Sequence, residues 1–413
     1  METLSSTLKS NPIVYVTRDI ERALGLPLDT SGYFIISNST SFAKRIANGR
    51  TNVLLIEETE VLDTREILEN KLAQNFIKEN SIKNILVFKN TSQIETICKK
   101  HDWKLLNPSA ALANKVEEKI SQIEWLGELT KYLPPHRIAI CKEIKWDNLP
   151  FILQFNRAHT GQGTFFIQTE TDLKLIQEKF PDRPVRVTDY IKGPMFTNNN
   201  VVTKEKILIG NINYQITGLT PFTDQPFSTI GNDWSLPDKL LSPDQKKQYC
   251  DIATAVGLRL MASGWKGLFG IDVVLDEDTD KLYLIEINAR QPASTTYESQ
   301  LQQSYKQTDI SNQQLTTFEA HLTSLLDINH NLDIIKINNG AQIILRVQPP
   351  VQSSEPMVQR DVIERLQSLK FDTIEYTNTA PGSDLLRIQS KNGIMEGHNK
   401  FNEIGNKIIQ NLI

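Results

Sequence analysis

The chain has 413 residues, a net charge of −4 and three cysteines, and this length predicts two to three domains at roughly 150 residues each. The slightly acidic balance argues against a nucleic-acid partner, and no apolar run approaches the roughly 20 residues of a membrane span. The N-terminal stretch METLSSTLKSNP lacks the hydrophobic core of a secretory signal, and the cysteines are widely separated. We therefore expect a cytoplasmic globular protein without disulfides or membrane contacts.

Residues 11–110 alternate short apolar runs with polar helical stretches, the pattern of an α/β domain with a mainly parallel sheet. The first turn, Thr17-Arg18-Asp19, lacks the glycine fingerprint of a dinucleotide-binding fold, so nothing here indicates NAD. The four candidate strands are Ile13–Val16, Tyr33–Ile36, Val53–Ile56 and Ile85–Phe88.

The middle of the chain begins with a predicted helix from Ala110 to about Leu133, which Pro134-Pro135 ends. A second helix should start at Ser242-Pro243-Asp244, because an N-cap serine precedes a proline and an acid, and run to about Ala262. The stretch 220–236 reads as a loop long enough to be functional. Between these helices lie a helical segment at 171–180 and candidate strands at 137–141, 151–155, 164–168, 186–190, 200–202, 207–211 and 213–217.

The C-terminal third opens with a hairpin and then becomes helical over residues 295–328. The last 80 or so residues read as mixed α/β, with a strand at Ala341–Val347 and a final helix near Lys400–Leu412.

The stretch GIDVVLDEDTDKLYLIEINAR at 270–290 places acids inside two otherwise apolar strands. With the turn near Thr279, antiparallel pairing sets Asp272 opposite Glu286, where like charges destabilise a sheet. Asn288 projects from the same face, and Arg290 follows it. A divalent metal such as Mg²⁺ would resolve the repulsion, and we favour it over a solvated hairpin because the flanking residues are apolar.

The stretch FILQFNRAHTGQGTFFI at 151–167 sets Gly161 and Gly163 between two apolar strands. Glycines let backbone N–H groups turn toward an anion, so this loop could fold over phosphates as a flap. Taken alone, the two glycines are more typical of an ordinary hairpin turn than of a phosphate flap.

Together these motifs resemble the ATP-grasp superfamily, in the three-domain layout of its biotin carboxylase and carbamoyl-phosphate synthase branch. The resemblance rests on Lys115, the glycine flap, the DYIKG stretch at 189–193 and the hairpin, in that order. It implies a pre-ATP-grasp α/β domain at 1–110, an α+β ATP-grasp domain at 111–330 with a flap subdomain at about 135–195, and a small mixed α/β domain at 331–413.

The resemblance also implies roles for individual residues. The Mg²⁺ ligands (or Mn²⁺ ligands) would be Asp272, Glu286 and Asn288, and Arg290 would lie near the transferred phosphate. The nucleotide-binding residues would be Lys115, Gln154, Arg157, Gly161, Gly163, and Asp189, Tyr190 and Ile191 at the hinge.

Several positions depart from the family pattern. Gln154 stands where the family has its second lysine, and Arg157 could partly replace that charge. Met195 stands where a ribose-binding acid is usual. Ser294 replaces the glutamate that serves as bicarbonate base in biotin carboxylases. Arg346 resembles a substrate-binding arginine, but a structural salt bridge explains an arginine in an apolar strand equally well.

The implied activity is that of an ATP-dependent ligase, which activates a carboxylate as an acyl phosphate and joins it to an amine, releasing ADP and phosphate. ATP and Mg²⁺ would be required, and a small-molecule carboxylate and amine would be the substrates. A degenerate nucleotide-binding sensor and a carboxylase-like enzyme remain as alternatives. The sequence leaves the oligomeric state open, a homodimer included.

Overall fold

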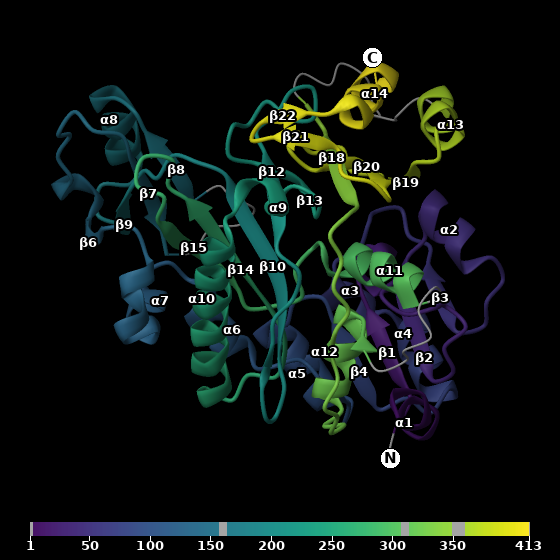
Figure 1. Ribbon diagram of the computed structural model, residues 1–413. Helices are drawn as coiled ribbons and strands as arrows, with labels where there is room; N and C mark the ends of the chain where they lie inside the picture. The colour runs from purple at the N-terminus through teal and green to yellow at the C-terminus, as the bar shows by residue number, and fades with distance from the viewer. Residues whose placement is uncertain (1–2, 157–162, 307–313, 349–359, 413) are drawn as a thin grey trace.

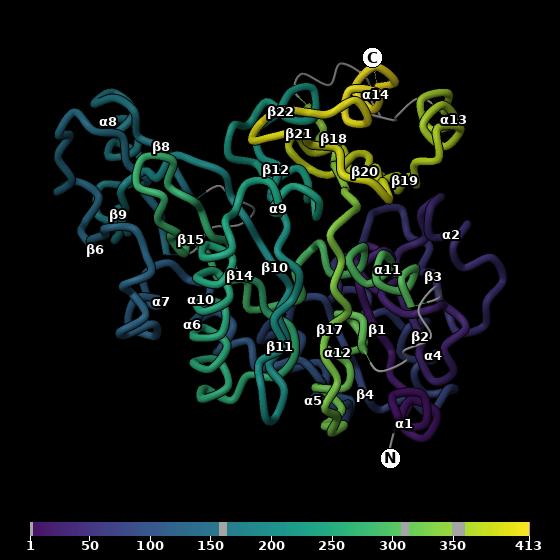
Figure 2. Tube along the Cα trace, viewed as in Figure 1, coloured from purple at the N-terminus to yellow at the C-terminus, as the bar shows by residue number. Residues whose placement is uncertain are grey.

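The computed structural model describes residues 3–156, 163–306, 314–348 and 360–412. Figure 1 shows an N-terminal α/β unit in purple and blue, a small sheet standing to one side, and a large central sheet that continues into the yellow C-terminal region. Figure 2 traces the chain from the N-terminus at the bottom of the view to the C-terminus at the top. None of the helices in these ranges combines the length and apolar character needed to cross a membrane.

The N-terminal unit is a five-stranded sheet in the order β3-β2-β1-β4-β5. All of its strand pairs are parallel, as predicted from the sequence. The central strand β1 is buried along its whole length, which explains its continuous apolar run. The strands are β1 (Ile13–Val16), β2 (Tyr33–Asn38), β3 (Val53–Ile56), β4 (Asn84–Val87) and β5 (Lys104–Leu105). The helices are α1 (Leu4–Ser10), the 3-10 turn η1 (Ile20–Ala23), α2 (Ser41–Ala47), α3 (Thr64–Glu69), α4 (Lys71–Glu79) and α5 (Ser92–Lys100).

The predicted long helix at 110–133 is wrong as a single element. It is divided into α6 (Ala110–Glu117), α7 (Ser121–Leu126) and the 3-10 turn η2 (Gly127–Tyr132). The chain becomes extended at Glu118, with φ −70° and ψ 128°. Asn156 stabilises the break, because its amide donates to the Glu118 carboxylate at 2.9 Å and accepts from the Ile120 N–H at 2.8 Å.

The flap sheet is a four-stranded antiparallel sheet in the order β6-β9-β7-β8. Helix α8 packs on it through Leu173 and Ile176 and closes a small separate core. The elements are β6 (His136–Ile140), the 3-10 turn η3 (Cys141–Glu143), β7 (Phe151–Phe155), β8 (Thr164–Ile167), α8 (Glu170–Lys179) and β9 (Pro184–Asp189).

The central sheet has nine strands, eight of them in the order β15-β14-β10-β12-β13-β18-β20-β19, with β11 paired to β10. Neighbouring residues of β10 point to opposite faces, so Val202 packs into the core that includes α10 and Val201 into the core that includes α12. The first strands are β10 (Met195–Val202), β11 (Ile207–Leu208), β12 (Asn213–Thr217), β13 (Thr229–Asp233), β14 (Gly267–Leu275) and β15 (Leu282–Asn288). The helices beside them are α9 (Pro237–Leu240), α10 (Pro243–Ala262), α11 (Thr295–Lys306) and α12 (Thr317–Leu325).

Helix α10 confirms the predicted start signal. The Ser242 hydroxyl accepts from the Gln245 N–H at 3.2 Å, and the Gln245 side chain accepts from the Ser242 N–H at 2.9 Å. This reciprocal capping box satisfies two backbone donors at the helix end.

The predicted loop at 220–236 is only partly a loop. Residues 229–233 form β13, which pairs with β12 on one side and with β18 on the other. The C-terminal strands therefore continue the central sheet by backbone hydrogen bonds. The remaining elements are β16 (Gln314–Leu315), β17 (Asp333–Ile334), β18 (Ala341–Arg346), α13 (Arg360–Ser368), β19 (Asp372–Glu375), β20 (Asp384–Ser390), β21 (Met395–Gly397), β22 (Lys400–Phe401) and α14 (Glu403–Leu412).

Two further predictions for this region need adjustment. The final helix begins at Glu403 rather than at residue 400, because the Asn402 side chain accepts from the N–H groups of Ile404 and Gly405 at 2.9 and 3.0 Å and so caps the helix. The predicted helical stretch at 295–328 contains the two helices α11 and α12, with the short strand β16 before the second.

Candidate active site

The hairpin of β14 and β15 places two carboxylates opposite each other. Asp272 pairs with Glu286 in the register, as predicted, and a bulge follows Asp272. The Asn288 amide donates to the Asp272 carboxylate at 3.2 Å. Three oxygen-bearing side chains thus meet on β14 and β15, two adjacent strands at one edge of the central sheet.

The two carboxylates differ in their ionisation. Burial, followed by the charge of Glu286, raises the pKa of Asp272 from 3.8 to about 6. Partial burial works against ionisation of Glu286, whose side chain keeps 40 % of its surface exposed. The cations Lys119, Arg290 and Arg186 outweigh that effect and hold the pKa of Glu286 below its usual value. Glu286 is therefore held as an anion, whereas Asp272 resists ionisation.

Two cations stand beside this pair. The Lys119 ammonium lies 2.9 Å from a Glu286 oxygen, and it follows the break after α6. The Arg290 guanidinium contacts the Glu117 carboxylate, whose other oxygen lies 2.7 Å from Lys89. Lys115, the lysine that the family resemblance singles out, lies on the exposed side of α6. Lys119 was not predicted, because its role depends on the break in the helix.

The flap residues fall partly outside the described ranges. Arg157 and Gly161 lie outside them, whereas Gly163 is buried in the turn before β8, and its carbonyl accepts from the Phe155 N–H at 2.9 Å. Gln154 is 6 % exposed in β7. Its side-chain oxygen accepts from Arg186, and its nitrogen donates to the Thr164 hydroxyl at 3.3 Å.

The hinge lies between β9 and β10. Asp189 is exposed at the end of β9, and its N–H donates to the Pro135 carbonyl at 3.0 Å. Tyr190 and Ile191 are half-buried. The Tyr190 ring lies 4.4 Å from Phe166 of β8 and 6.3 Å from Phe227, centroid to centroid. These three rings connect the flap sheet to the loop at 218–228.

Arg346 is held by several contacts at the end of β18. Its guanidinium contacts the Asp384 carboxylate and donates to the Thr229 carbonyl at 2.7 Å. The structure therefore contains the structural salt bridge that the sequence left as one of two interpretations. Its Nε is buried without a hydrogen-bond partner among the described residues.

A large cavity lies where η1 and α2, helix α11, and strands β18 to β20 approach one another. Its volume is about 610 Å³, within the range of small-molecule sites. Ala293 and Thr296 line it, three and six positions after Arg290, and so does Tyr297, whose buried hydroxyl has no hydrogen-bond partner in the described ranges. The charged side chains of its lining are Arg22, Arg45, Lys370, Arg387, Lys391, Glu21 and Asp372.

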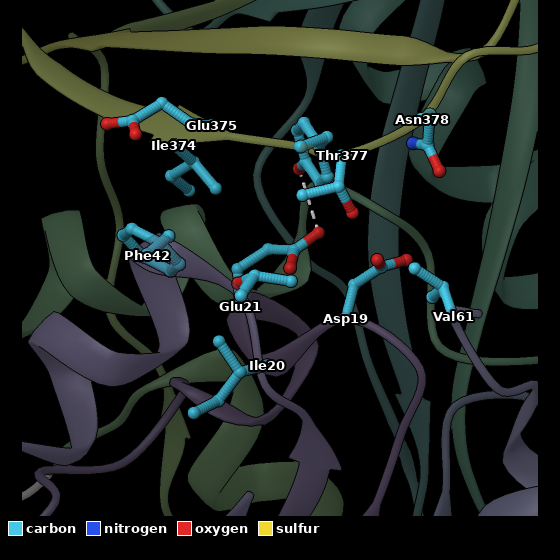
Figure 3. A pocket seen from close by; sticks show the side chains of 11 residues that line it. Asp19, Ile20, Glu21, Phe42, Val61, Ile374, Glu375, Thr377 and Asn378 are labelled. Carbon is cyan, nitrogen blue, oxygen red and sulfur yellow. Dashed lines mark hydrogen bonds between the residues drawn. The ribbon is translucent and has the colours of Figure 1, made fainter. Parts of the chain in front are cut away.

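A second, narrow cavity of about 10 Å³ lies beside the large one, between η1 and the residues at 374–378. Figure 3 shows Asp19 and Glu21 rising toward Thr377 from the N-terminal unit. Glu21 accepts from the Tyr376 hydroxyl at 2.8 Å, and that hydroxyl accepts from Arg387 at 3.0 Å. Burial and then the charge of Glu21 raise the pKa of Asp19 to about 6. This cavity has room for about one water molecule, so it is a polar contact between the N-terminal unit and the C-terminal strands rather than a substrate site.

The donor set of the hairpin suits Mg²⁺. In the described ranges no group of three or more His, Cys, Asp and Glu side chains could hold a metal by itself. Mg²⁺, however, is usually bound through one or two carboxylates together with substrate phosphates. Asp272 and Glu286 supply two carboxylates, and Asn288 supplies an amide oxygen. Mn²⁺ accepts the same oxygen ligands.

Comparisons with known proteins concern the domain that contains this site. Residues 116–294 match the model of the ATP-grasp domain, and that range contains the whole hairpin and Lys119. A search of curated protein sequences finds no match.

Solved structures share the fold over almost the whole chain. Carboxyaminoimidazole ribonucleotide synthase from Aspergillus clavatus, complexed with ATP, has a TM-score of 0.66 at 17% identity and covers 98% of this chain and 99% of its own. N5-carboxyaminoimidazole synthetase from Staphylococcus aureus, complexed with ADP, has a TM-score of 0.64 at 11% identity and covers 97% of each chain.

A biotin carboxylase domain has the same architecture. That of the Hydrogenobacter thermophilus 2-oxoglutarate carboxylase, in complex with MgADP, ADP and bicarbonate, has a TM-score of 0.61 at 12% identity and covers 93% of this chain and 86% of its own. At these identities the likeness establishes the fold. The chain therefore contains a region, residues 116–294, that matches the ATP-grasp domain, and over almost its whole length it shares the fold of carboxyaminoimidazole ribonucleotide synthase and of biotin carboxylase.

Proposed function

We propose that this protein is an ATP-dependent ligase that activates a carboxylate as an acyl phosphate and joins it to an amine, releasing ADP and phosphate. The observation that carries the proposal is the pairing of Asp272 with Glu286, beside Asn288, with Lys119 and Arg290 close by. An opposed acid pair inside a central sheet is unfavourable without a cation, so the arrangement indicates a role in metal and phosphate binding.

Each residue then has a definite task. Asp272, Glu286 and Asn288 would hold Mg²⁺, which neutralises charge on the β- and γ-phosphate oxygens when bound. Lys119 and Arg290 orient the phosphate oxygens and stabilise the negative charge of the moving phosphoryl group. In the free protein Lys119 pairs with Glu286, and Arg290 pairs with Glu117. The site therefore does not have to bury an uncompensated ion.

The chemistry needs no side-chain nucleophile. A carboxylate oxygen of the substrate attacks the γ-phosphorus, and the bond to the ADP oxygen breaks. The amine nitrogen then attacks the acyl carbon, the carbon–oxygen bond to phosphate breaks, and the nitrogen loses its extra proton to the departing phosphate or to water. Positioning and charge stabilisation perform both steps.

The 610 Å³ cavity supplies a place for the substrates. Ala293, three positions after Arg290, is part of its lining, which has five basic side chains against two acids and so suits an anionic substrate. Ser294, in the position of the bicarbonate base, is buried and donates to Asn199 at 3.1 Å, so it cannot take a proton from bicarbonate. This supports a carboxylate other than bicarbonate. The proposal also includes three domains, with boundaries near residues 110 and 330. The strands of the third domain are joined to the central sheet.

Product analysis tests the proposal. The protein is incubated with MgATP and pools of carboxylates and amines, and ADP, AMP and phosphate are quantified. ADP and phosphate are expected, with one ¹⁸O passing from labelled carboxylate into phosphate and a hydroxamate forming when hydroxylamine replaces the amine. AMP formation would instead indicate an adenylating enzyme, and bicarbonate-dependent ADP release would indicate a carboxylase. ATP binding without turnover would indicate a nucleotide sensor.

A further inference from the structure

Arg186 is a buried cation in the middle of the flap sheet. It lies in β9, directly across from Gln154 of β7, and its side chain is 2 % exposed. Its Nε and Nη2 donate to the Gln154 oxygen at 3.0 and 2.6 Å, and its Nη1 donates to the Gln122 oxygen at 3.0 Å. Both acceptors are neutral amides.

The charge of Arg186 therefore lacks a direct counter-ion. In the ranges that the structure describes, no carboxylate lies within ion-pair distance of it, whereas a buried arginine normally has such a partner. Burial lowers the pKa of Arg186 to about 10, so the guanidinium stays protonated at neutral pH, and the charge of Glu286 acts in the opposite direction. Arg186 lies on β9 between β6 and β7, so this buried charge belongs to the flap sheet, whose strand β7 leads to the glycine turn.

The guanidinium also retains hydrogen-bonding capacity. It has five N–H donors in a planar fork, and three of them serve the two glutamines. A phosphate oxygen is the ligand that best matches a planar fork with a fixed positive charge. Gln154 also donates to Thr164, the first residue after the flap turn, so the pair is connected to the flap itself.

We propose that Arg186 binds the phosphates of the nucleotide and supplies the positive charge that Gln154 cannot. The Gln154 oxygen orients the guanidinium by accepting two of its hydrogen bonds. Arg186 lies on β9, one strand away from the β7 position at which the family pattern places a lysine. The inference rests on the proposed function, because it assigns the nucleotide site to the face between the flap sheet and the hairpin.

The test compares nucleotide binding, rather than activity, across four proteins. Parent, Arg186→Met, Gln154→Glu and the double variant Gln154→Lys/Arg186→Met are titrated with MgATP, MgADP and adenosine by calorimetry. Gln154→Glu keeps the size and the acceptor of the side chain and adds an ion pair to Arg186, so it preserves folding while neutralising the cation. Thermal melting without nucleotide checks the fold of each variant.

Arg186→Met and Gln154→Glu should each weaken MgATP and MgADP binding by roughly 10- to 100-fold, the range for charge-assisted hydrogen bonds. Adenosine, which has no phosphate, should bind all four proteins alike. The double variant should regain most of the lost affinity, because the lysine restores a cation one strand away. A structural role would give a different pattern, with all three ligands weakened equally and no rescue.

The outcomes separate the two proposals. Tight MgATP binding that survives both Arg186→Met and Gln154→Glu would overturn the role of Arg186 and leave the ligase proposal intact. Equal loss of ATP, ADP and adenosine in the well-folded Gln154→Glu protein would also overturn it. No ATP binding to the parent protein would overturn both proposals together.

Discussion

At the scale of single residues, Asp272 and Glu286 are the positions on which the proposed function depends most directly. The sequence predicted their opposition because a hairpin with a short polar turn has a nearly fixed register. It did not predict Lys119, Glu117 or Arg186, because none of them belongs to a local pattern. Their roles come from a helix break and from a cross-strand pair, which form only when distant segments meet.

Replacing Glu286 by glutamine should abolish ATP turnover while leaving the fold intact. The change removes a proposed metal ligand. Its two electrostatic effects on stability oppose each other, because it removes the repulsion between Glu286 and Asp272 but leaves Lys119 without its ion-pair partner. The melting temperature without metal should therefore move little. ADP release and thermal melting are the measurements, with Asp278→Asn on the exposed hairpin turn as the control. Normal turnover in Glu286→Gln would remove the metal assignment.

The pKa of Asp272 predicts how metal binding and stability depend on pH. Because the folded state raises this pKa from 3.8 to about 6, protonation stabilises the fold. That contribution is fully present below about pH 4 and is lost as the pH rises through about 6. Mg²⁺ needs the ionised form, so Mg²⁺-dependent ADP binding should strengthen over the same interval.

Two variants separate the effect of Asp272 from that of Asp19, the other aspartate whose pKa is raised to about 6. Asp272→Asn should flatten the dependence of the unfolding free energy on pH between 4 and 6.5 and should weaken Mg²⁺-dependent binding. Asp19→Asn should flatten the stability curve as well, because its pKa is also about 6, but it should leave the pH dependence of metal binding unchanged. Urea unfolding and calorimetry supply the data. Identical pH profiles in the parent and Asp272→Asn proteins would refute the assignment.

At the scale of elements, most helices and strands could be predicted from the period of the hydrophobic residues and from helix-capping residues. Strands β1, β3, β7 and β12 begin and end at the predicted residues. Strand β13 was missed because Gly231, Asn232 and Asp233 are residues typical of turns. Buried amides stabilise it instead, since Asn232 donates to Asn213 at 2.8 Å and accepts from Gln342 at 2.9 Å. Such a polar strand has no apolar alternation from which it could be predicted.

The aromatic contact between the flap sheet and the loop at 218–228 can be tested directly. Phe227 is 49% exposed, yet its ring lies 5.1 Å from Phe166 in an edge-to-face arrangement. Phe227→Ala should remove about 0.5–1.5 kcal/mol of interaction and raise hydrogen exchange in β8 and in the loop. Exchange in β1 should be unchanged. Leu149→Ala, an apolar residue of the same region that is 66% exposed, is the matched control. Equal exchange in both variants would show that the rings do not hold the loop.

At the scale of the whole molecule, the pairing of β13 with β18 makes one sheet of the ATP-grasp and C-terminal parts. The hydrogen bonds that join Glu21, Tyr376 and Arg387 add a second connection, from the N-terminal unit to the C-terminal strands. We therefore expect the central sheet and its C-terminal strands to unfold in one cooperative step.

Gly231 provides the test of that expectation. A Cβ at this position would lie 2.2 Å from the main-chain oxygen of Gln342, so Gly231→Ala should force β13 and β18 apart and cost about 1–3 kcal/mol. Gly397→Ala, where a Cβ meets nothing within 4 Å, is the control. Differential scanning calorimetry should show a lowered transition that remains single. Two separate transitions in the parent protein would contradict the single-sheet interpretation.

The continuous sheet also has a consequence for the synthesis of this protein. Strand β13 leaves the ribosome more than 100 residues before β18, its hydrogen-bonding neighbour. At roughly 5–20 residues per second, the edge of the growing sheet stays open for about 5 to 20 seconds. An open edge can pair with another chain, so polar side chains along β13 protect the nascent protein. We therefore expect the buried Asn232 and Asp233 of this strand to disfavour aggregation of the unfinished chain before its last strands arrive.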